Sequence, residues 1–297
     1  MLIAVLDGCQ TEASSANKGQ TYTCPKCNEV VVLKKGRIVV DHFAHKPSAN
    51  CVYAAGETHE HMSGKLAIRD SFRSRGIDAE IERPVLSVDG DRRADILISS
   101  PTSKQRFIAI ELQHQPIDLD QIEHRTLAYI AAGVPVLWIP ILRKGFLDEA
   151  IMGEGDDDGD CYIKRYATPP WLRWLAEYVG ERSLWFYDAE NRCFWRGQLS
   201  PCQIYVPPSD WYDADGNEQS SGGYWKQSRR WMRLDLWGAY ALTDVRLLSW
   251  YRPPGRSRDY KFPQGRIGAL VLAKEIATRS TSTTGIPTET QPCEKES

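Results

Sequence analysis

The sequence of 297 residues predicts an α/β fold with a mixed central sheet, whose core elements follow the order α-β-β-β-α-β. Two segments carry apolar residues at helical spacing: 58–75 and 118–132. Four segments alternate in polarity or are continuously apolar, as strands are: 77–88, 93–99, 106–113 and 134–140. The length is sufficient for two domains with cores of their own.

Both helices have recognisable ends. The first is expected to run from Thr58 to Arg75, with Gly76 at its end and an apolar stripe made of Met62, Leu66, Ile68 and Phe72. The second is expected to begin after Asp118, which serves as its cap, and to close at Gly133.

The strands are separated by turn residues. Asp89-Gly90 is a hairpin signal after the first strand, and residues 101–104 form a turn between the second and third. Segment 134–140 is a buried strand reached over a helix, so we expect it to lie parallel to a neighbour.

Two pairs of metal-ligand residues precede this core, in a zinc-finger-like module over residues 1–56. Cys24 and Cys27 form a CxxC, His42 and His45 form an HxxH, and the apolar segments 30–33 and 38–40 between them predict a hairpin. This spacing is typical of a structural Zn²⁺ site with four protein ligands, and Cys51 is an alternative ligand to His45. The other interpretation is two reduced buried cysteines with surface histidines.

Charge and hydropathy exclude some function classes. The net charge of −2 provides no general polybasic field for nucleic acid, so any such attraction must be local. No apolar run has the length of a membrane span, and residues 1–9 are expected to be a first strand rather than a lipoprotein signal. Eight irregularly scattered cysteines suit a reducing compartment, so we expect a cytoplasmic protein.

Two carboxylates in apolar strands predict a divalent-metal site. Asp95 lies on the second strand, and Glu111 and Gln113 share one face of the third because they are two residues apart. Mg²⁺ (or Mn²⁺) prefers such hard oxygen ligands, and a group at position 113 would orient the attacking water. Alternatively, Asp95 pairs with an arginine and Glu111 caps a helix.

The helices add candidates for the same site. His61 and Lys65 are one turn apart, so either could contact phosphate, while His61 could instead contact the metal and Lys65 could supply a catalytic cation. Arg125 and Tyr129 share a face of the second helix, where Arg125 is a candidate phosphate clamp and Tyr129 a candidate substrate contact. The alternatives are a solvated helix face, an ion pair of Arg125 with Glu111 or Asp95, and a core position for Tyr129. Glu82 is a candidate third metal ligand or an exposed acid on the sheet face.

These motifs together resemble the competence protein CoiA family over about residues 1–140. The residues that carry the resemblance are Tyr22, Cys24, Cys27, His42, His45, Glu57, His61, Lys65, Arg93, Asp95, Glu111, Gln113, Arg125, Tyr129 and Trp138. The resemblance implies a bacterial protein with a PD-(D/E)XK restriction-endonuclease-like core behind the zinc-finger-like module, linked to incoming DNA and recombination. It points to Asp95, Glu111 and Gln113 as the active-site core. Gln113 stands where most members of the superfamily have Lys.

The rest of the chain differs in composition. After a nuclease-like domain over 57–147, residues 148–160 are expected to be an acidic linker, 161–277 a Trp-rich basic C-terminal domain, and 278–297 a disordered tail. Nine of the ten tryptophans lie between 171 and 250, and 224–266 holds ten Lys/Arg against three Asp. This block is either a face for single-stranded DNA or mostly core. We expect core for most tryptophans and a basic surface at Arg229, Arg230 and Arg233.

The sequence thus predicts a Mg²⁺-dependent nuclease that acts on DNA, single-stranded DNA included, in competence or recombination. Recombination proteins are expected partners and a membrane is not. The alternative is a non-catalytic DNA-binding or adaptor protein on a degenerate nuclease fold.

Overall fold

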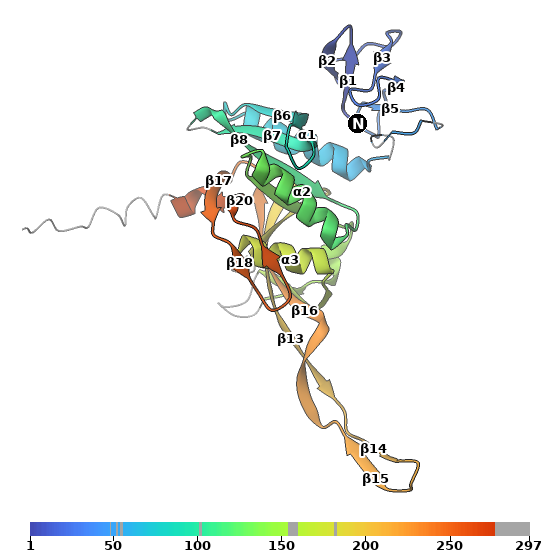
Figure 1. Ribbon diagram of the computed structural model, residues 1–297, viewed down its shortest axis with the longest axis vertical. Helices are drawn as coiled ribbons and strands as arrows, with labels where there is room; N and C mark the ends of the chain where they lie inside the picture. The colour runs from blue at the N-terminus through green and yellow to red at the C-terminus, as the bar shows by residue number, and fades with distance from the viewer. Residues whose placement is uncertain are drawn as a thin grey trace, which may run out of the picture.

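A small N-terminal sheet, a mixed α/β region and a long β-arm lie one after another along the long axis of the molecule (Figure 1). The computed structural model describes residues 1–47, 49–51, 53, 56–100, 103–153, 160–180 and 183–276. None of the helices within these ranges is both long enough and apolar enough to span a bilayer. The predicted disordered tail lies outside the described residues.

The N-terminal sheet has the strand order β2-β1-β3-β4-β5. Its strands are β1 (Ile3–Leu6), β2 (Cys9–Glu12), β3 (Tyr22–Thr23), β4 (Val30–Lys34) and β5 (His42–Ala44). A small core around Tyr22, Val31 and Phe43 holds it together. The strand that pairs with β4 is β5, with Lys34 opposite His42, and not the predicted segment 38–40.

The next six elements follow the predicted order α-β-β-β-α-β. They are α1 (His59–Arg73), β6 (Ala79–Val85), β7 (Arg92–Ser100), β8 (Ser103–Gln113), α2 (Leu119–Ala131) and β9 (Val136–Leu142). Strands β6, β7 and β8 are antiparallel, and β9 is parallel to β8 because α2 provides the crossover. The mixed α/β class and this element order are confirmed.

The sheet continues from β9 into the C-terminal half. The remaining elements are η1 (Phe146–Glu149), β10 (Ile151–Met152), β11 (Cys161–Ala167), α3 (Pro170–Val179), β12 (Ser183–Asp188), β13 (Cys193–Val206), β14 (Ser209–Tyr212), β15 (Glu218–Ser221), β16 (Tyr224–Ala241), β17 (Val245–Arg252), β18 (Gly255–Arg256), β19 (Lys261–Phe262) and β20 (Gly265–Leu272). The main path is β10-β11-β16-β13-β12-β9-β8-β7-β6, and β20 also pairs with β9. The predicted division into domains remains a prediction. Backbone hydrogen bonds between strands join the predicted nuclease-like domain and the predicted C-terminal domain into one sheet.

The predicted acidic linker begins with regular structure. Residues 146–149 form a 3₁₀ turn, and Ile151 and Met152 form β10, which pairs with β11. Residues 154–159 of that segment lie outside the described residues.

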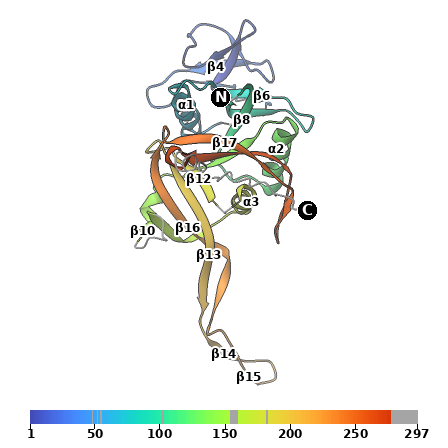
Figure 2. The same ribbon diagram turned by 90° about the vertical axis from the view of Figure 1, so that its left-hand side faces the viewer.

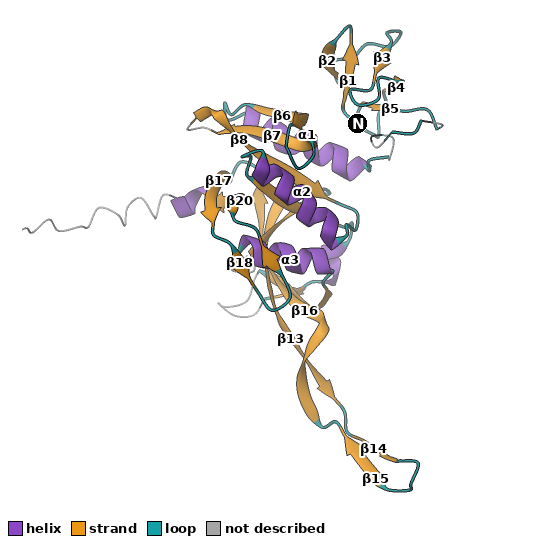
Figure 3. Ribbon diagram, viewed as in Figure 1, coloured by secondary structure: helices purple, strands orange, loops and turns teal. Residues whose placement is uncertain are grey.

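Two apolar cores lie on opposite faces of the central sheet. On one face, Met62, Ile68 and Phe72 of α1 pack with Ile96 and Ile110. On the other, side chains of α2 and α3, which lie side by side in Figure 3, pack with the sheet: Ile122, Tyr129, Trp174, Ala109 and Trp138. Each large apolar side chain buried here contributes about 1.5–3 kcal/mol to stability. Helices α1 and α2 are therefore firmly held against the strands that carry the candidate site.

The tryptophans divide between core and surface. Four are buried, namely Trp138, Trp171, Trp174 and Trp185, whereas Trp211, Trp225 and Trp250 are exposed. The exposed Trp211 and Trp225 belong to an arm in which β13 and β16 leave the sheet and end in the β14–β15 hairpin. Both views place this arm at the opposite end of the molecule from the N-terminal sheet (Figures 1 and 2).

Candidate functional site

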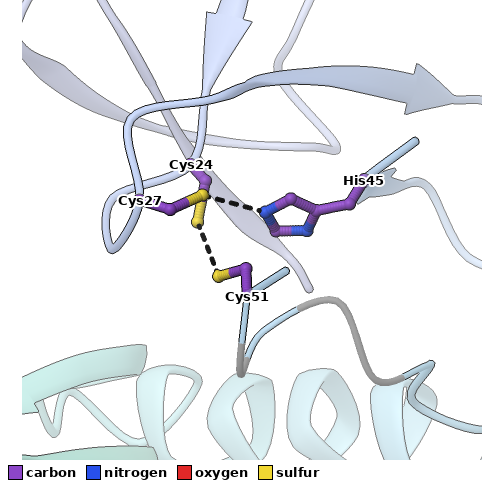
Figure 4. Close-up of side chains that lie close together, drawn as sticks. All are labelled: Cys24, Cys27, His45 and Cys51. Carbon is purple, nitrogen blue, oxygen red and sulfur yellow. Dashed lines mark hydrogen bonds between the residues drawn. The ribbon is translucent and has the colours of Figure 1, made fainter. Parts of the chain in front are cut away.

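Three cysteines and one histidine converge in the N-terminal module (Figure 4). Cys24 and Cys27 come from the turn after β3, His45 follows β5, and Cys51 comes from the segment beyond. Their ligand atoms all lie within 4.8 Å of one another, with 4.0 Å between the Cys24 and Cys51 sulfurs and 3.4 Å between Cys27 Sγ and His45 Nε2. Ligands on a tetrahedral zinc at 2.0–2.3 Å stand about 3.5–3.8 Å apart, so the cluster fits zinc in both geometry and donor type.

The turn that carries the two CxxC thiols is held by its own backbone. The Cys24 amide donates to Glu29 O (2.9 Å), the Asn28 amide donates to Cys24 O (2.9 Å), and Asn28 takes a positive φ of 60°. The amides of Lys26 and Tyr53 donate to the sulfurs of Cys24 and Cys51 (3.3 and 3.4 Å). Amide donors around thiolates are the outer partners expected of a metal site.

His42 lies outside this cluster, and Cys51 takes the fourth place instead. The sequence predicted His42 with His45 and offered Cys51 only in place of His45. The physical reason is the strand: residues three apart on β5 and its extension point to opposite faces. His42 Nδ1 lies 2.9 Å from the Val40 carbonyl oxygen.

The start of α1 brings several charged side chains toward the sheet. Thr58 caps the helix by accepting from the His61 amide (3.2 Å), so the first turn is well defined. Gly64 faces Tyr187 and Leu112, and a Cβ there would lie 2.8 Å from the Tyr187 ring. The missing side chain therefore lets α1 approach β8 closely, which places His61 and Lys65 beside β6 and β7.

Asp95 is held between α1 and β8. Its Oδ2 lies 3.0 Å from His61 Nε2 and accepts from the Leu112 amide (2.9 Å), while its Oδ1 lies 3.7 Å from Lys65 Nζ. Burial opposes ionisation, but the charge and hydrogen bond of His61 and the charge of Lys65 outweigh it and lower the pKa of Asp95 to about 2. The same pair raises the pKa of His61 to about 9 against the effect of burial.

Lys65 is fully buried among carboxylates. Its ammonium donates to Glu57 Oε2 and Glu82 Oε1, both at 2.7 Å. Burial alone would lower the pKa of Lys65, but the charges of Glu82, Asp95 and Glu57 raise it above its ordinary value. Lys65 thus neutralises carboxylates inside the site and has no path to a substrate phosphate in this conformation.

Glu82 is buried, so the interpretation of an exposed acid was wrong. Its φ of 53° is unusual for a residue in a strand and turns its side chain toward α1, next to Ile81, which faces the same way. It accepts from the amides of Leu2 and Ile3 (2.9 and 3.1 Å) and from Arg93 (3.3 Å). Glu82 therefore joins the N-terminal sheet to the candidate site.

Glu111 is held by the other helix. Both of its oxygens are occupied, one by the Arg125 guanidinium and one by the Tyr129 hydroxyl. Burial raises the pKa of Glu111, and Arg125 only partly offsets this. Arg125, with its side chain 34% exposed, also lies over the Trp138 ring at 4.8 Å.

The predicted site residues are thus gathered at one end of the sheet but held by different helices. Asp95 contacts α1, and Glu111 contacts α2. Gln113 follows Glu111 on β8, is partly exposed, and donates to the Gln115 carbonyl. Tyr129 is fully buried and bonds Glu111, so in this conformation it contacts the site carboxylate rather than a substrate.

Comparison with known proteins identifies the region that carries these residues. Residues 6–54 match the family model of the competence protein CoiA N-terminal domain, and residues 57–144 match that of the CoiA nuclease-like domain. The N-terminal half of this chain is thus similar to both domains of the CoiA family. The resemblance seen in the motifs is thereby confirmed.

A curated relative agrees with this assignment. Competence protein CoiA of Bacillus subtilis (strain 168) is 24% identical over 123 residues, which cover 41% of this chain and 32% of that protein. The chain therefore spans about a third of the length of that relative. No solved structure matches the chain.

The charges of the candidate site are balanced by protein groups. Four carboxylates, those of Glu57, Glu82, Asp95 and Glu111, face the four cations of His61, Lys65, Arg93 and Arg125. Asp95 and Glu111 offer oxygen donors of the type Mg²⁺ prefers. A divalent ion nonetheless fits only if Arg125 leaves Glu111, which its partial exposure allows.

Three of these residues received little or no weight from the sequence. Glu57 was noticed only as part of the family resemblance, and Arg93 only there and as one of the arginines that could pair with Asp95. Glu82 was interpreted as a metal ligand or an exposed acid, and not as a buried partner of Lys65 and Arg93. A signal existed for Glu57, since it precedes His61 by four residues and Lys65 by eight, which is one helical face.

Proposed function

We propose that this chain acts on DNA as a Mg²⁺-dependent nuclease in competence or recombination, with a PD-(D/E)XK-type site at Asp95, Glu111 and Gln113. One observation carries the proposal: Asp95 Oδ2 accepts from the Leu112 amide, so this largely buried carboxylate on β7 reaches β8 at the residue next to Glu111, within a nuclease-like domain. The element order α-β-β-β-α-β supports it.

In this proposal Arg125 has two positions. Without substrate it pairs with Glu111, as observed. With DNA bound, its guanidinium would turn outward to the phosphate that it was predicted to clamp, and Glu111 would then be available as a ligand for the metal ion. Bound there, Mg²⁺ would supply a water of lowered pKa and a counter-charge for the scissile phosphate.

The remaining groups of the site position the two carboxylates. Lys65 and His61 keep Asp95 ionised, and Tyr129 fixes Glu111 through its second oxygen. Gln113 orients water as an amide, since it cannot donate a proton as a Lys would.

The Cys24–Cys27–His45–Cys51 cluster is proposed to hold a structural Zn²⁺. Four protein ligands leave no open position for chemistry. Because Glu82 accepts from the amides of Leu2 and Ile3 at the start of β1, the zinc module also supports one wall of the candidate active site.

The test is cleavage of end-labelled linear duplex and single-stranded DNA with Mg²⁺ or Mn²⁺. Asp95→Asn and Glu111→Gln keep side-chain volume and remove charge, and both should abolish cleavage. Asp120→Asn on the exposed first turn of α2 is the matched control and should cleave as wild type. Cleavage that survives either site substitution, or that persists in EDTA, contradicts the proposal.

A second function is favoured by the charge balance of the site. A carboxylate cluster already neutralised by four cations is stable without metal, as in a DNA-binding adaptor on a degenerate nuclease fold. Wild-type protein that binds the same DNA in gel shift but does not cut it with either metal would establish the adaptor and exclude the nuclease.

A further inference from the structure

The β13–β16 arm separates its charges along its length. Its tip, residues 209–221, holds four acids and no Lys or Arg: Asp210, Asp213, Asp215 and Glu218. Its base, on β16, holds Lys226, Arg229, Arg230 and Arg233. An anionic polymer is therefore attracted to the base of the arm and repelled by the tip.

A polar cavity of about 550 Å³ lies at the base of the arm, where β16 meets α3 and the β18–β19 hairpin. Its lining is Arg173, Gln227, Ser228, Arg229, Arg258 and Asp259. Arg229 and Arg258 are exposed, and neither makes an ion pair within the described part of the chain. Three arginines facing one carboxylate leave this cavity with surplus positive charge.

The backbone of β16 is shaped to present these arginines. The pairing of β13 with β16 shifts between Pro201 and Gln203, which places the four residues 228–231 of β16 opposite the single residue Cys202. The Ser228 hydroxyl accepts from the amides of Arg230 and Trp231 (3.2 and 2.9 Å) and so stabilises the bulge. Arg173 supports it from α3 by donating to the Arg230 carbonyl (2.9 Å).

An aromatic pair lies next to the cavity on the same face of the ribbon. Tyr205 and Trp225 are cross-strand partners with ring centroids 5.4 Å apart, and they are 47% and 68% exposed. Trp225 is two residues from Gln227, which lines the cavity, so the two side chains share a face. Because the two rings are adjacent, they form a contiguous exposed apolar patch, as binding surfaces do.

We propose that this strip, from the Arg173–Arg229–Arg258 cavity to the Tyr205–Trp225 pair, binds single-stranded DNA. The arginines contact backbone phosphates, and unpaired bases stack on the two rings. A duplex hides the faces of its bases, so it gains only the phosphate contacts. The inference deepens the proposed function, because it assigns a substrate-holding surface remote from Asp95 and Glu111.

The test is fluorescence anisotropy of the full chain with a labelled oligo(dT), which forms no duplex. Stacking on an aromatic side chain is worth about 1–3 kcal/mol per base, so Trp225→Ala should weaken binding by about 5- to 150-fold. Arg229→Gln with Arg258→Gln should lower the slope of log K against log salt by about 1.4, since each phosphate contact contributes about 0.7 for a single strand. These side chains are exposed, so the variants should melt as wild type does.

The acidic tip provides the matched control. Trp211 is 47% exposed on β14, so Trp211→Ala removes an aromatic of the same kind outside the proposed strip and should leave the Kd unchanged. Wild-type Kd values for both the Trp225 and the double arginine variants would overturn the inference. The two proposals fail separately. If the strip variants lose binding and the wild type cuts no DNA, the nuclease proposal is refuted and the strip is upheld. If the strip variants bind normally and the wild type cuts DNA, the strip is refuted and the nuclease proposal is upheld.

Discussion

Replacing Lys65 by Met tests how much the charge cluster around this residue contributes to the stability of the protein. Lys65 is 0% exposed and contacts Glu57, Glu82 and Asp95 at 2.7, 2.7 and 3.7 Å. Methionine has similar length and fills the space, so the substitution removes charge with little change in packing. It leaves three buried carboxylates with one cation fewer.

The expected loss is about 3–5 kcal/mol at neutral pH, the usual cost of removing one partner from a buried ion pair. It is not three times that value because each carboxylate keeps another partner. Glu57 and Glu82 retain Arg93, and Asp95 retains His61 and the Leu112 amide.

The pH dependence gives the prediction its sign. In the wild type the hydrogen bond to His61 and the charge of Lys65 outweigh burial and keep the pKa of Glu57 below the ordinary value, and the charges of Lys65 and Arg93 do the same for the pKa of Glu82. Their stabilising contribution is therefore complete above the unfolded pKa, about 4.3, and is lost as pH falls. In Lys65→Met these carboxyls become easier to protonate, so the deficit should be largest near pH 7.5 and smaller at pH 5.5.

The assay is urea unfolding followed by tryptophan fluorescence at both pH values. Lys144→Met is the control, because Lys144 is 87% exposed and pairs only loosely with Glu190 at 3.7 Å, so its unfolding midpoint should not move. A deficit for Lys65→Met below about 1 kcal/mol, or one equal at both pH values, would refute the reasoning.

Three further predictions concern other parts of the molecule. Metal analysis of the purified wild-type protein should return about one zinc ion per chain. His45→Ala and Cys51→Ser should lose this zinc, whereas His42→Ala should keep it. Loss of zinc from the His42 variant would contradict the proposed ligand set. Glu82→Gln should destabilise the protein by about 3–5 kcal/mol at neutral pH and by less as pH falls toward 4. It should also speed proteolysis between the N-terminal sheet and α1, since the amides of Leu2 and Ile3 lose part of their acceptor. An unchanged rate of proteolysis there would show that Glu82 does not join the two parts. Gln113→Lys should raise the rate of DNA cleavage with Mg²⁺, because a cation replaces an amide beside Glu111; a rate equal to wild type would mean that residue 113 does not act in the reaction.

The fold of the core was predictable because its signals are local. The stripe of α1, the glycines after α1 and α2 and the turn at Gly90 each depend on residues close together in sequence, and the helix bounds came within two residues. The hairpin of the zinc module was less accurate. The strand partner of β4 is chosen by the core around Phe43, which no local pattern specifies.

What the sequence determined by itself was the type of chemistry present: a CxxC with nearby histidines, carboxylates in apolar strands, and cations on the adjoining helices. Periodicity and residue chemistry are sufficient for that. Only the tertiary structure decided the partners. It put Cys51 in place of His42 because β5 is a strand, buried Glu82 through a positive φ, and gave Glu111 to Arg125 and Asp95 to His61 and Lys65. The physical reason is that a buried charge takes whichever counter-charge packing brings within reach, and packing joins residues far apart in the chain.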